Sequence, residues 1–289
     1  MTSELDHFKS NGFFVAKNLL DEQSVDVVRH SIAKTFLDQL AEIPAVVEKD
    51  DIFSAMRTLY RHDIDRYKKV ASAVWRKLDV YQLMHDPRII GFLRNKFGWQ
   101  DIFVAGGQVA HIMAHELKIP DGYFGLVPHQ DFPSVQGSLD GVVVWLPLVK
   151  VDRDNFPLEV IPGSHKRGLL PIVNDGKASW EIKPDQYQEE DYMPAEVDKG
   201  DVIFISMFTV HRSSKNGTLG RYRLALSTRF DNADEATFIE RCYPTAYERN
   251  VHRAQYFPGF PTIEQVEATF QTNENDKGVR IRITEPNIK

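Results

Sequence analysis

The chain contains a single cysteine, Cys242, among its 289 residues. An internal disulfide framework is therefore excluded, and the fold must rely on a packed core. Hydrophobic residues make up 42% of the chain and charged residues 26%, which is ordinary for a globular protein with one sizeable core. Because the sequence shows no base partner for the lone thiol, we do not expect it to act as a nucleophile. Such scarce use of cysteine fits a reducing compartment.

The chain also lacks the features that direct a protein to a membrane or to nucleic acid. No segment approaches the roughly 18 consecutive apolar residues of a membrane span, and the polar residues 1–7 lack the apolar core of a secretory signal. The formal net charge of −6 argues against nucleic acid or an anionic membrane surface as the main partner. We therefore expect a cytoplasmic protein that acts on a small molecule, with no nucleic-acid or membrane partner. The sequence leaves the oligomeric state open.

The first hundred residues follow helical spacing. Asp21 is well placed to cap a helix at its N-terminus. Residues 62–98 are expected to be mostly helical, with Pro87 at the start of the last short helix and Gly98 at its end. The apolar residues that define the helix after Asp21 are Val25, Val28, Ile32, Phe36 and Leu40.

From about residue 101 the pattern changes to short apolar segments separated by Gly, Pro and Asp. Turn-forming residues at such short intervals predict many short strands in a sandwich or barrel, here a cupin-like jelly roll. We expect a mostly β chain with flanking α-helices in a single domain, 1–289. It would comprise a helical part at about 1–100, a jelly-roll core at about 101–230 and a C-terminal extension at 231–289 with a helix near 262–271. The expected strands are 102–104, 108–113, 142–146, 158–161, 202–205 and 222–230.

The motif His129-Gln130-Asp131 carries the most specific chemistry. In an extended strand, side chains two residues apart point the same way, so His129 and Asp131 can face one ion while Gln130 turns aside. A second histidine would complete two histidines and one carboxylate, the facial triad of non-haem Fe(II) oxygenases. His211 is the candidate, because it lies at or just past the end of the strand expected at 202–205. Taken alone, the motif also fits a hydrogen-bonded pair at the surface.

An arginine in the next expected strand suggests the cosubstrate. In the run 222–230, Arg223 shares a face with Ala225 and Ser227, and Arg221 extends that face. A buried arginine needs an anionic partner, and its planar fork suits a carboxylate. The dicarboxylate 2-oxoglutarate can chelate iron through its 2-keto acid end and reach the arginine with the other end. A structural ion pair with an acidic residue is the alternative for Arg223.

These motifs resemble those of the phytanoyl-CoA dioxygenase (PhyH) family of Fe(II)/2-oxoglutarate-dependent oxygenases. The resemblance covers roughly residues 100–230, in the family's order. Its motifs are Pro128-His129-Gln130-Asp131, Trp145-Leu146-Pro147-Leu148, Ile161-Pro162-Gly163-Ser164-His165-Lys166, Gly200-Asp201, His211-Arg212-Ser213, Asn216 and Arg223-Leu224-Ala225.

The resemblance implies a double-stranded β-helix and a role for each motif. By similarity, His129, Asp131 and His211 are iron ligands, and Arg223 binds the C5 carboxylate of 2-oxoglutarate. Ser213 adds a hydroxyl to that carboxylate, while Trp145 and Gln108 line the cosubstrate pocket. The spacing from histidine to arginine is one residue longer than is usual in the family, so Arg221 remains an alternative to Arg223.

Several of these residues have ordinary structural alternatives. Trp145 also fits core packing, and Gln108 fits a buried, hydrogen-bonded amide. His111 and His115 are four residues apart, but the apolar residues around them favour a strand, so we expect structural or substrate-facing roles rather than zinc. Gly163 and Ser164 are expected to shape a turn, with a catalytic base at His165 as the lesser alternative.

We therefore expect an Fe(II)/2-oxoglutarate-dependent dioxygenase, an oxidoreductase that uses O₂ to hydroxylate a C–H bond of a small metabolite and releases succinate and CO₂. The alternative is a cupin-like metalloprotein acting as a non-redox isomerase or hydrolase, or as a ligand-binding module. Phe132 and Gln136 are candidates for substrate contact. The segments 43–70, 130–137 and the polar insertion 171–199 are expected to shape the substrate pocket, and the insertion is expected to be a solvated loop or a lid. The sequence does not identify the substrate.

Overall fold

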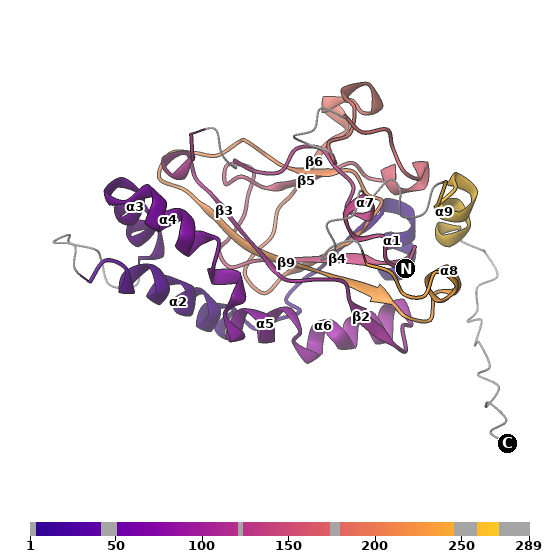
Figure 1. Ribbon diagram of the computed structural model, residues 1–289, viewed down its shortest axis with the longest axis horizontal. Coiled ribbons are helices and arrows are strands. Elements are labelled where there is room, and N and C mark those ends of the chain that lie inside the picture. The colour runs from indigo at the N-terminus through magenta and orange to yellow at the C-terminus, as the bar shows by residue number, and fades with distance from the viewer. Residues whose placement is uncertain (1–3, 42–50, 121–123, 174–179, 246–258, 272–289) are drawn as a thin grey trace, which may run out of the picture.

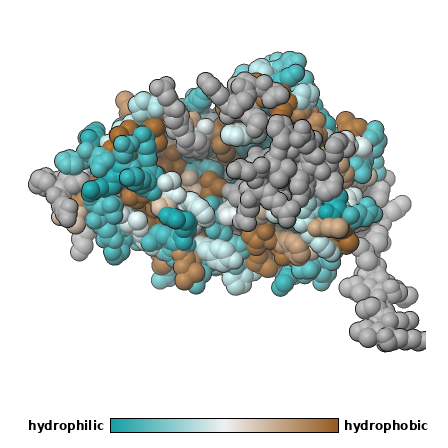
Figure 2. All heavy atoms as spheres, viewed as in Figure 1, coloured by the Kyte–Doolittle hydropathy of each residue, from teal (hydrophilic) through white to brown (hydrophobic). Residues whose placement is uncertain are grey.

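The structure is a computed structural model that describes residues 4–41, 51–120, 124–173, 180–245 and 259–271 (Figure 1). Antiparallel sheets form its centre, with helices along one side. Figure 2 shows that hydrophilic side chains cover much of the described surface in that view, with apolar residues in small separate patches. Among the described helices, none has both the length and the apolar character needed to cross a bilayer.

The N-terminal helices form where their caps and apolar spacing predict them. Asp21 accepts a hydrogen bond from the backbone N–H of Ser24, and the expected apolar stripe of the helix that follows is buried. Pro87 begins the last short helix, and Gly98 ends the helical turn after it in the left-handed conformation. The helices of this part are α1 (Glu4–Asn11), α2 (Glu22–Asp38), α3 (Ile52–His62), α4 (Ile64–Ala71), α5 (Leu78–Met84) and α6 (Pro87–Phe92).

Two antiparallel sheets follow. The larger has the strand order β1-β7-β4-β9-β2, with β3 also paired to β9, and the smaller has the order β6-β5-β8. The strands of the larger sheet are β1 (Phe13–Ala16), β2 (Ile102–Val104), β3 (Val109–Met113), β4 (Val142–Pro147), β7 (Val202–Ser206) and β9 (Arg223–Asn232). Those of the smaller sheet are β5 (Leu158–Val160), β6 (Met193–Ala195) and β8 (His211–Ser213).

The antiparallel β core with flanking helices is confirmed, but the chain is not mostly β. Helical residues outnumber strand residues in the described part, because the strands are short and helices fill most of the first hundred residues. Of the two positions expected for His211, at or just past the end of the strand expected at 202–205, the second is observed: β7 ends at Ser206 and His211 begins a separate strand, β8. The helix expected in the C-terminal extension is present as α9 (Ile263–Phe270), after the short α8 (Ala236–Glu240). One hydrophobic core contains residues from Phe8 to Phe270, and the proposed domain boundaries stay a prediction.

The two faces of the larger sheet have different surroundings. On one face Phe230 meets the ring of His85, and Phe204 stacks on Phe92 of α6 with ring centroids 4.5 Å apart. Figure 1 shows α2, α5 and α6 along this side of the sheet. The alternate residues of the same strands face the smaller sheet, where Trp145 of β4 and Arg223 of β9 line a cavity. Strand alternation therefore separates an apolar layer from a polar site.

A carboxyl group is buried at the far end of β9. Asp231 is 1% exposed and accepts a hydrogen bond of 2.9 Å from the backbone N–H of Ser138. A Cβ at Gly137 would overlap this carboxylate, so the loop requires glycine there. Burial raises the pKa of Asp231 to about 7, and the nearby charge of Asp140 adds to the effect. Because this pKa lies above its ordinary value of 3.8, the folded state favours the protonated group.

We predict that Asp231 makes the protein less stable as the pH rises from about 4 to 7. In that range the folded state retains a proton that the unfolded state has lost, so the free energy of unfolding falls with pH. Asp231→Asn keeps the acceptor and removes the titration, so its stability relative to wild type should improve by about 2–4 kcal/mol over the range. Urea unfolding at several pH values measures this difference. Asp185→Asn, at an exposed position, should show no such trend; an equal trend in both variants would contradict the assignment.

Candidate metal centre

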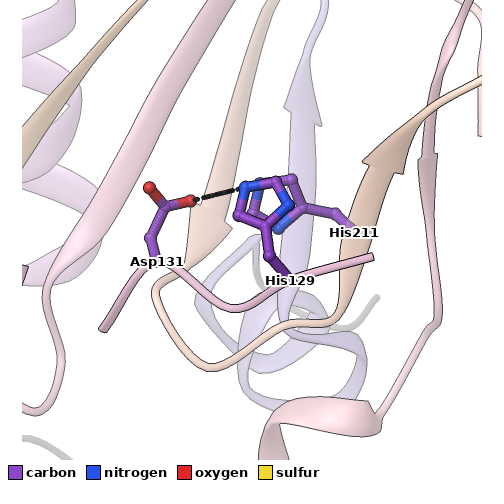
Figure 3. Close-up of side chains that lie close together, drawn as sticks. All are labelled: His129, Asp131 and His211. Atoms are coloured by element: carbon purple, nitrogen blue, oxygen red, sulfur yellow. Dashed lines mark ion pairs between the residues drawn. The ribbon is translucent and has the colours of Figure 1, made fainter. Parts of the chain in front are cut away.

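The backbone holds the two histidines side by side. His129 forms an isolated β-bridge with His211, with backbone hydrogen bonds of 3.0 and 3.1 Å in the two directions. The centroids of the two rings are 4.2 Å apart. Asp131 does not continue the extended segment, because it is the N-terminal cap residue of the short helix α7 (Phe132–Val135). Its carboxylate nevertheless faces the histidines (Figure 3).

The three side chains converge in a buried place. Nε2 of His211 lies 3.1 Å from Oδ2 of Asp131, and Nε2 of His129 lies 3.9 Å from the same oxygen. One ligand atom from each residue lies within 4.8 Å of the others. His129 is 5% exposed, Asp131 3% and His211 4%. The structure thus assembles the three residues that the sequence placed 82 positions apart, from 129 to 211.

The hydrogen bonds of the three residues fit a bound metal ion. Nδ1 of His129 donates to the carbonyl of Val127 over 2.7 Å, and Nδ1 of His211 donates to that of Thr209 over 2.9 Å. With the protons on Nδ1, each Nε2 keeps a lone pair directed toward Asp131. Oδ2 of Asp131 is buried and accepts no hydrogen bond from any described residue. Two nitrogens and one oxygen are therefore available to a single cation, which is the donor set of non-haem iron.

The electrostatics of the site support a neutral His129 and an ionised Asp131. Burial lowers the pKa of His129 to about 3, so its ring is neutral and able to act as a ligand. Burial opposes ionisation of Asp131, but the positive charge of Arg229 together with the interactions with His211 and His129 holds its pKa well below the usual range. Asp131 is therefore a carboxylate at neutral pH.

The triad opens onto a small cavity between the two sheets. Arg223 is 1% exposed, and it donates to the carbonyl of Phe156 over 2.7 Å and to the hydroxyl of Ser213 over 3.0 Å. Arg221 points elsewhere and forms two hydrogen bonds, of 2.8 and 2.6 Å, with Asp152. The structure therefore places Arg223 rather than Arg221 in the cavity. The other lining residues are His111, Leu126, His129, Val143, Trp145, Leu158, Ile205, His211, Arg212, Ser213, Ser227 and Arg229.

Three candidates from the sequence do not line this cavity. Gln108 is buried and lines a separate, open pocket of about 600 Å³ together with Trp75 and Tyr81. Phe132 stacks on Phe208 with ring centroids 4.6 Å apart. Gln136 ends α7 in the left-handed conformation, with φ of +56°. Their roles in cosubstrate or substrate binding stay predictions.

Two cavity residues were missed or left open by the sequence. Arg229 donates to Oδ1 of Asp131 from Nε over 3.0 Å and from Nη2 over 2.8 Å. It follows Ser227 by two residues, so the alternation that placed Arg223 and Ser227 on one face predicts Arg229 there as well. His111 reaches the cavity from β3, with Nε2 2.9 Å from Oγ of Ser227. The other histidine of that pair, His115, contacts the carbonyl of Gly217.

Gln130 turns away from the metal centre, as expected. Its Nε2 donates to the carbonyls of Gly168 and Phe208 over 2.8 and 2.6 Å, and its Oε1 accepts from the N–H of Leu170 over 2.9 Å. The bonds to Gly168 and Leu170 connect the metal motif to the segment that follows the Pro162-Gly163-Ser164-His165 turn. In that turn Gly163 has φ of +77°, which favours glycine.

The turn itself has a structural role. Oγ of Ser164 donates to the carbonyl of Ile161 over 2.6 Å and accepts from the N–H of Val210 over 2.9 Å. Nε2 of His165 contacts the carbonyl of Lys9 at 2.9 Å, and its ring packs against Phe270. Because His165 does not line the cavity, its position offers no support for a catalytic base.

Comparison with known proteins places the chain in a family. A family model described as Phytanoyl-CoA dioxygenase (PhyH) matches residues 8–225. The peroxisomal phytanoyl-CoA dioxygenase of Mus musculus is 25% identical over 238 residues, covering 78% of this chain and 67% of the relative. That of Homo sapiens is 26% identical over 241 residues, with the same shares covered.

Solved structures share the fold at low sequence identity. The non-haem alpha ketoglutarate dependent carbocyclase SnoK, from nogalamycin biosynthesis, has a TM-score of 0.54 and 18% identity, covering 80% of this chain and 83% of its own. The epimerase SnoN, in complex with Fe3+, alpha ketoglutarate and nogalamycin RO, has a TM-score of 0.53 and 18% identity, covering 80% and 82%. These likenesses show a common fold.

The metal centre, the fold and the family match define an iron- and 2-oxoglutarate-dependent oxygenase, an oxidoreductase of the dioxygenase class. The chain belongs to the phytanoyl-CoA dioxygenase (PhyH) family. The expected cofactors, iron and 2-oxoglutarate, are thereby confirmed. The expected cytoplasmic location stays a prediction, since the mammalian relatives are named as peroxisomal.

We predict that Gln130 stabilises the metal motif without touching the metal. Gln130→Leu would leave two carbonyls and one N–H buried without their partner, which should lower the free energy of unfolding by about 2–4 kcal/mol. Urea unfolding of the metal-free protein measures the change. The matched control is Gln82→Leu at an exposed position of α5. A loss for Gln130→Leu no larger than the control's would show that these hydrogen bonds are unimportant.

Proposed function

We propose that this protein oxidises a C–H bond of a small-molecule metabolite, by hydroxylation, with release of succinate and CO₂. His129, Asp131 and His211 are the proposed iron ligands. The observation that carries the proposal is the buried convergence of two Nε2 atoms and one carboxylate oxygen at a cavity that also contains Arg223. Iron, 2-oxoglutarate and O₂, when bound, would supply the oxidising chemistry, with O₂ as the oxidant. The residues of the chain bind and orient these groups.

The charge of the cavity suits a dianionic cosubstrate. Arg223 and Arg229 bring two positive charges to its wall, and Asp131, bonded to Arg229, brings one negative charge close by. The third lining arginine, Arg212, is paired with Glu159 and Glu189. Burial lowers the pKa of His111 well below its usual value, and the two arginines lower it further, so this ring adds no charge. A divalent cation at the triad would make the site more positive. A dicarboxylate such as 2-oxoglutarate would offset that charge.

We propose Arg223 as the partner of the C5 carboxylate, with Ser213 beside it. The guanidinium already holds the Ser213 hydroxyl at 3.0 Å, so both groups can be donors to one carboxylate. Trp145 would form an apolar wall of the same pocket. The free volume of the cavity is about 10 Å³, roughly that of one water molecule. Binding of 2-oxoglutarate therefore requires the lining side chains to move apart.

The arrangement of the sheets supports a jelly roll in a single domain. The cavity has Trp145 and Ile205 of the larger sheet on one side and Leu158 and Ser213 of the smaller sheet on the other. A site enclosed between two antiparallel sheets is typical of this architecture. Part of the insertion also lies at the site, because residue Glu181 forms a β-bridge with His129.

Hydroxylation is the proposed outcome because the site retains a carboxylate ligand. Halogenation requires this ligand to be replaced so that halide can bind, and Asp131 disfavours it. Epimerisation, desaturation and ring formation can use the same ligands, and relatives of this fold include a named epimerase and a named carbocyclase. The non-redox cupin-like alternative has no role for the buried Arg223 and Ser213 pair.

We predict that the purified protein releases succinate from 2-oxoglutarate only when Fe(II) and O₂ are supplied, and faster when a substrate from a metabolite screen is present. Asp131→Ala removes the anionic ligand and should abolish this release. Chromatographic quantification of succinate measures the effect. Asp191→Ala, an exposed acidic position, is the control. Equal release by wild type and Asp131→Ala, or release independent of Fe(II), would overturn the proposal.

A second prediction separates the two arginines. Arg223→Met should weaken 2-oxoglutarate binding by about 10- to 150-fold, the equivalent of one charge-assisted hydrogen bond of about 1.5–3 kcal/mol. Arg221→Met should leave the affinity within about threefold, because its partner, Asp152, lies outside the cavity. Calorimetry on the Mn(II)-loaded protein under nitrogen measures both. The reverse order of effects would assign the carboxylate to Arg221.

A further inference from the structure

The two oxygens of the Asp131 carboxylate have different surroundings. Oδ1 accepts two hydrogen bonds from Arg229, of 3.0 Å from Nε and 2.8 Å from Nη2. Oδ2 accepts none within the described part of the chain, and it faces Nε2 of His211 and of His129. The arginine thus binds one oxygen and leaves the other directed at the metal centre.

This difference determines how the carboxylate can bind a metal ion. A carboxylate can coordinate through one oxygen or chelate through both, and chelation takes up one more position on the metal. With two N–H groups directed at Oδ1, rotation that brings Oδ1 to the metal would break both charge-assisted bonds. Coordination through Oδ2 alone leaves that position open, as a facial triad requires for its cosubstrate and O₂.

Arg229 is itself held firmly in place. The residue is buried, with 6% of its surface exposed, and its Nη1 donates to Oγ of Ser227 over 3.2 Å. That hydroxyl also contacts Nε2 of His111 at 2.9 Å. The backbone of Arg229 pairs with Val143 in β4, and its carbonyl accepts from the N–H of Ala105 over 3.0 Å. A guanidinium held by the Ser227 hydroxyl and by a backbone paired in the sheet can set the orientation of the carboxylate that it binds.

We propose that Arg229 is a positioning residue that presents Asp131 to the metal through Oδ2 alone. The chain of contacts runs from His111 through Ser227 and Arg229 to Asp131. This inference rests on the proposed metal ligation by His129, Asp131 and His211. It gives Arg229 a role separate from that of Arg223, which lies on the same strand and contacts Ser213 instead.

The first test measures Co(II) binding to the metal-free protein by calorimetry and visible absorption, which reports the coordination number. Arg229→Met should weaken binding by about 10- to 100-fold, the usual effect of losing a residue that orients a metal ligand, and should change the absorption spectrum. Arg229→Lys keeps the charge but loses the planar guanidinium with its two N–H donors. The affinity of this variant for Co(II) should therefore lie between those of wild type and Arg229→Met. Arg221→Met is the matched control and should resemble wild type.

The second test uses formate to replace the missing carboxylate. In Asp131→Gly, Arg229 should hold formate where the side-chain carboxylate was, so formate should restore Co(II) binding and the wild-type absorption. In the double variant Asp131→Gly with Arg229→Met, formate should restore neither. Equal rescue in the two variants would show that Arg229 does not position the carboxylate, because a purely structural role predicts no difference.

The outcomes separate this inference from the proposed function. Absence of Co(II) binding by wild type, or unchanged binding by His129→Ala, would overturn the ligation itself. Normal binding by wild type with unchanged affinity and spectrum in Arg229→Met would overturn only the positioning role. If Arg229→Met does not fold, Arg229→Lys provides the test. Wild-type Co(II) affinity together with a wild-type absorption spectrum in this variant would show that the guanidinium is not needed to position Asp131.

Discussion

The register of strand β9 is the constraint on which the site depends. This ten-residue strand pairs with β4 along one side and with β3 and β2 along the other. Its alternate residues Arg223, Ser227 and Arg229 face the cavity, while Leu226 and Phe230 are buried on the opposite face. A shift of one residue would turn the arginines toward the helices and the apolar side chains toward the metal centre. The pairing that stabilises the sheet therefore also places the charges.

Burying two guanidinium groups in one core is unfavourable unless polar groups surround them. Arg229 is neutralised by Asp131, and Arg223 is bonded to the carbonyl of Phe156 and the hydroxyl of Ser213. Such pairs contribute little net stability, because desolvation offsets most of the attraction between the charges. The presence of these two arginines in the core is better explained by function. In the proposed function, one arginine orients an iron ligand and the other receives an anionic cosubstrate.

The sequence predicted the parts of the fold and site that depend on local patterns. Helix caps, strand alternation and the spacing of His129 and Asp131 act over a few residues, and the structure assembles both residues with His211. Features set by tertiary contacts were harder to predict. Asp131 stands directly before a short helix rather than continuing a strand, and Gln108 lines a different pocket, beside Trp75 and Tyr81. The direction of the Arg229 side chain could have been predicted by extending the strand alternation from Ser227 by two residues. Its contact with Asp131 could not, because that contact depends on how distant segments pack together.

In the proposed function, the metal and Arg223 hold the two ends of one cosubstrate. The most direct measurement is the affinity of wild-type protein for 2-oxoglutarate under nitrogen, by calorimetry, with and without Fe(II). If the ligand spans both groups, Fe(II) must strengthen its binding by roughly tenfold or more, a coupling of at least about 1.4 kcal/mol, and 2-oxoglutarate must strengthen Fe(II) binding equally. Equal affinity in the presence and absence of Fe(II) would contradict the account, since it would place 2-oxoglutarate away from the triad of His129, Asp131 and His211.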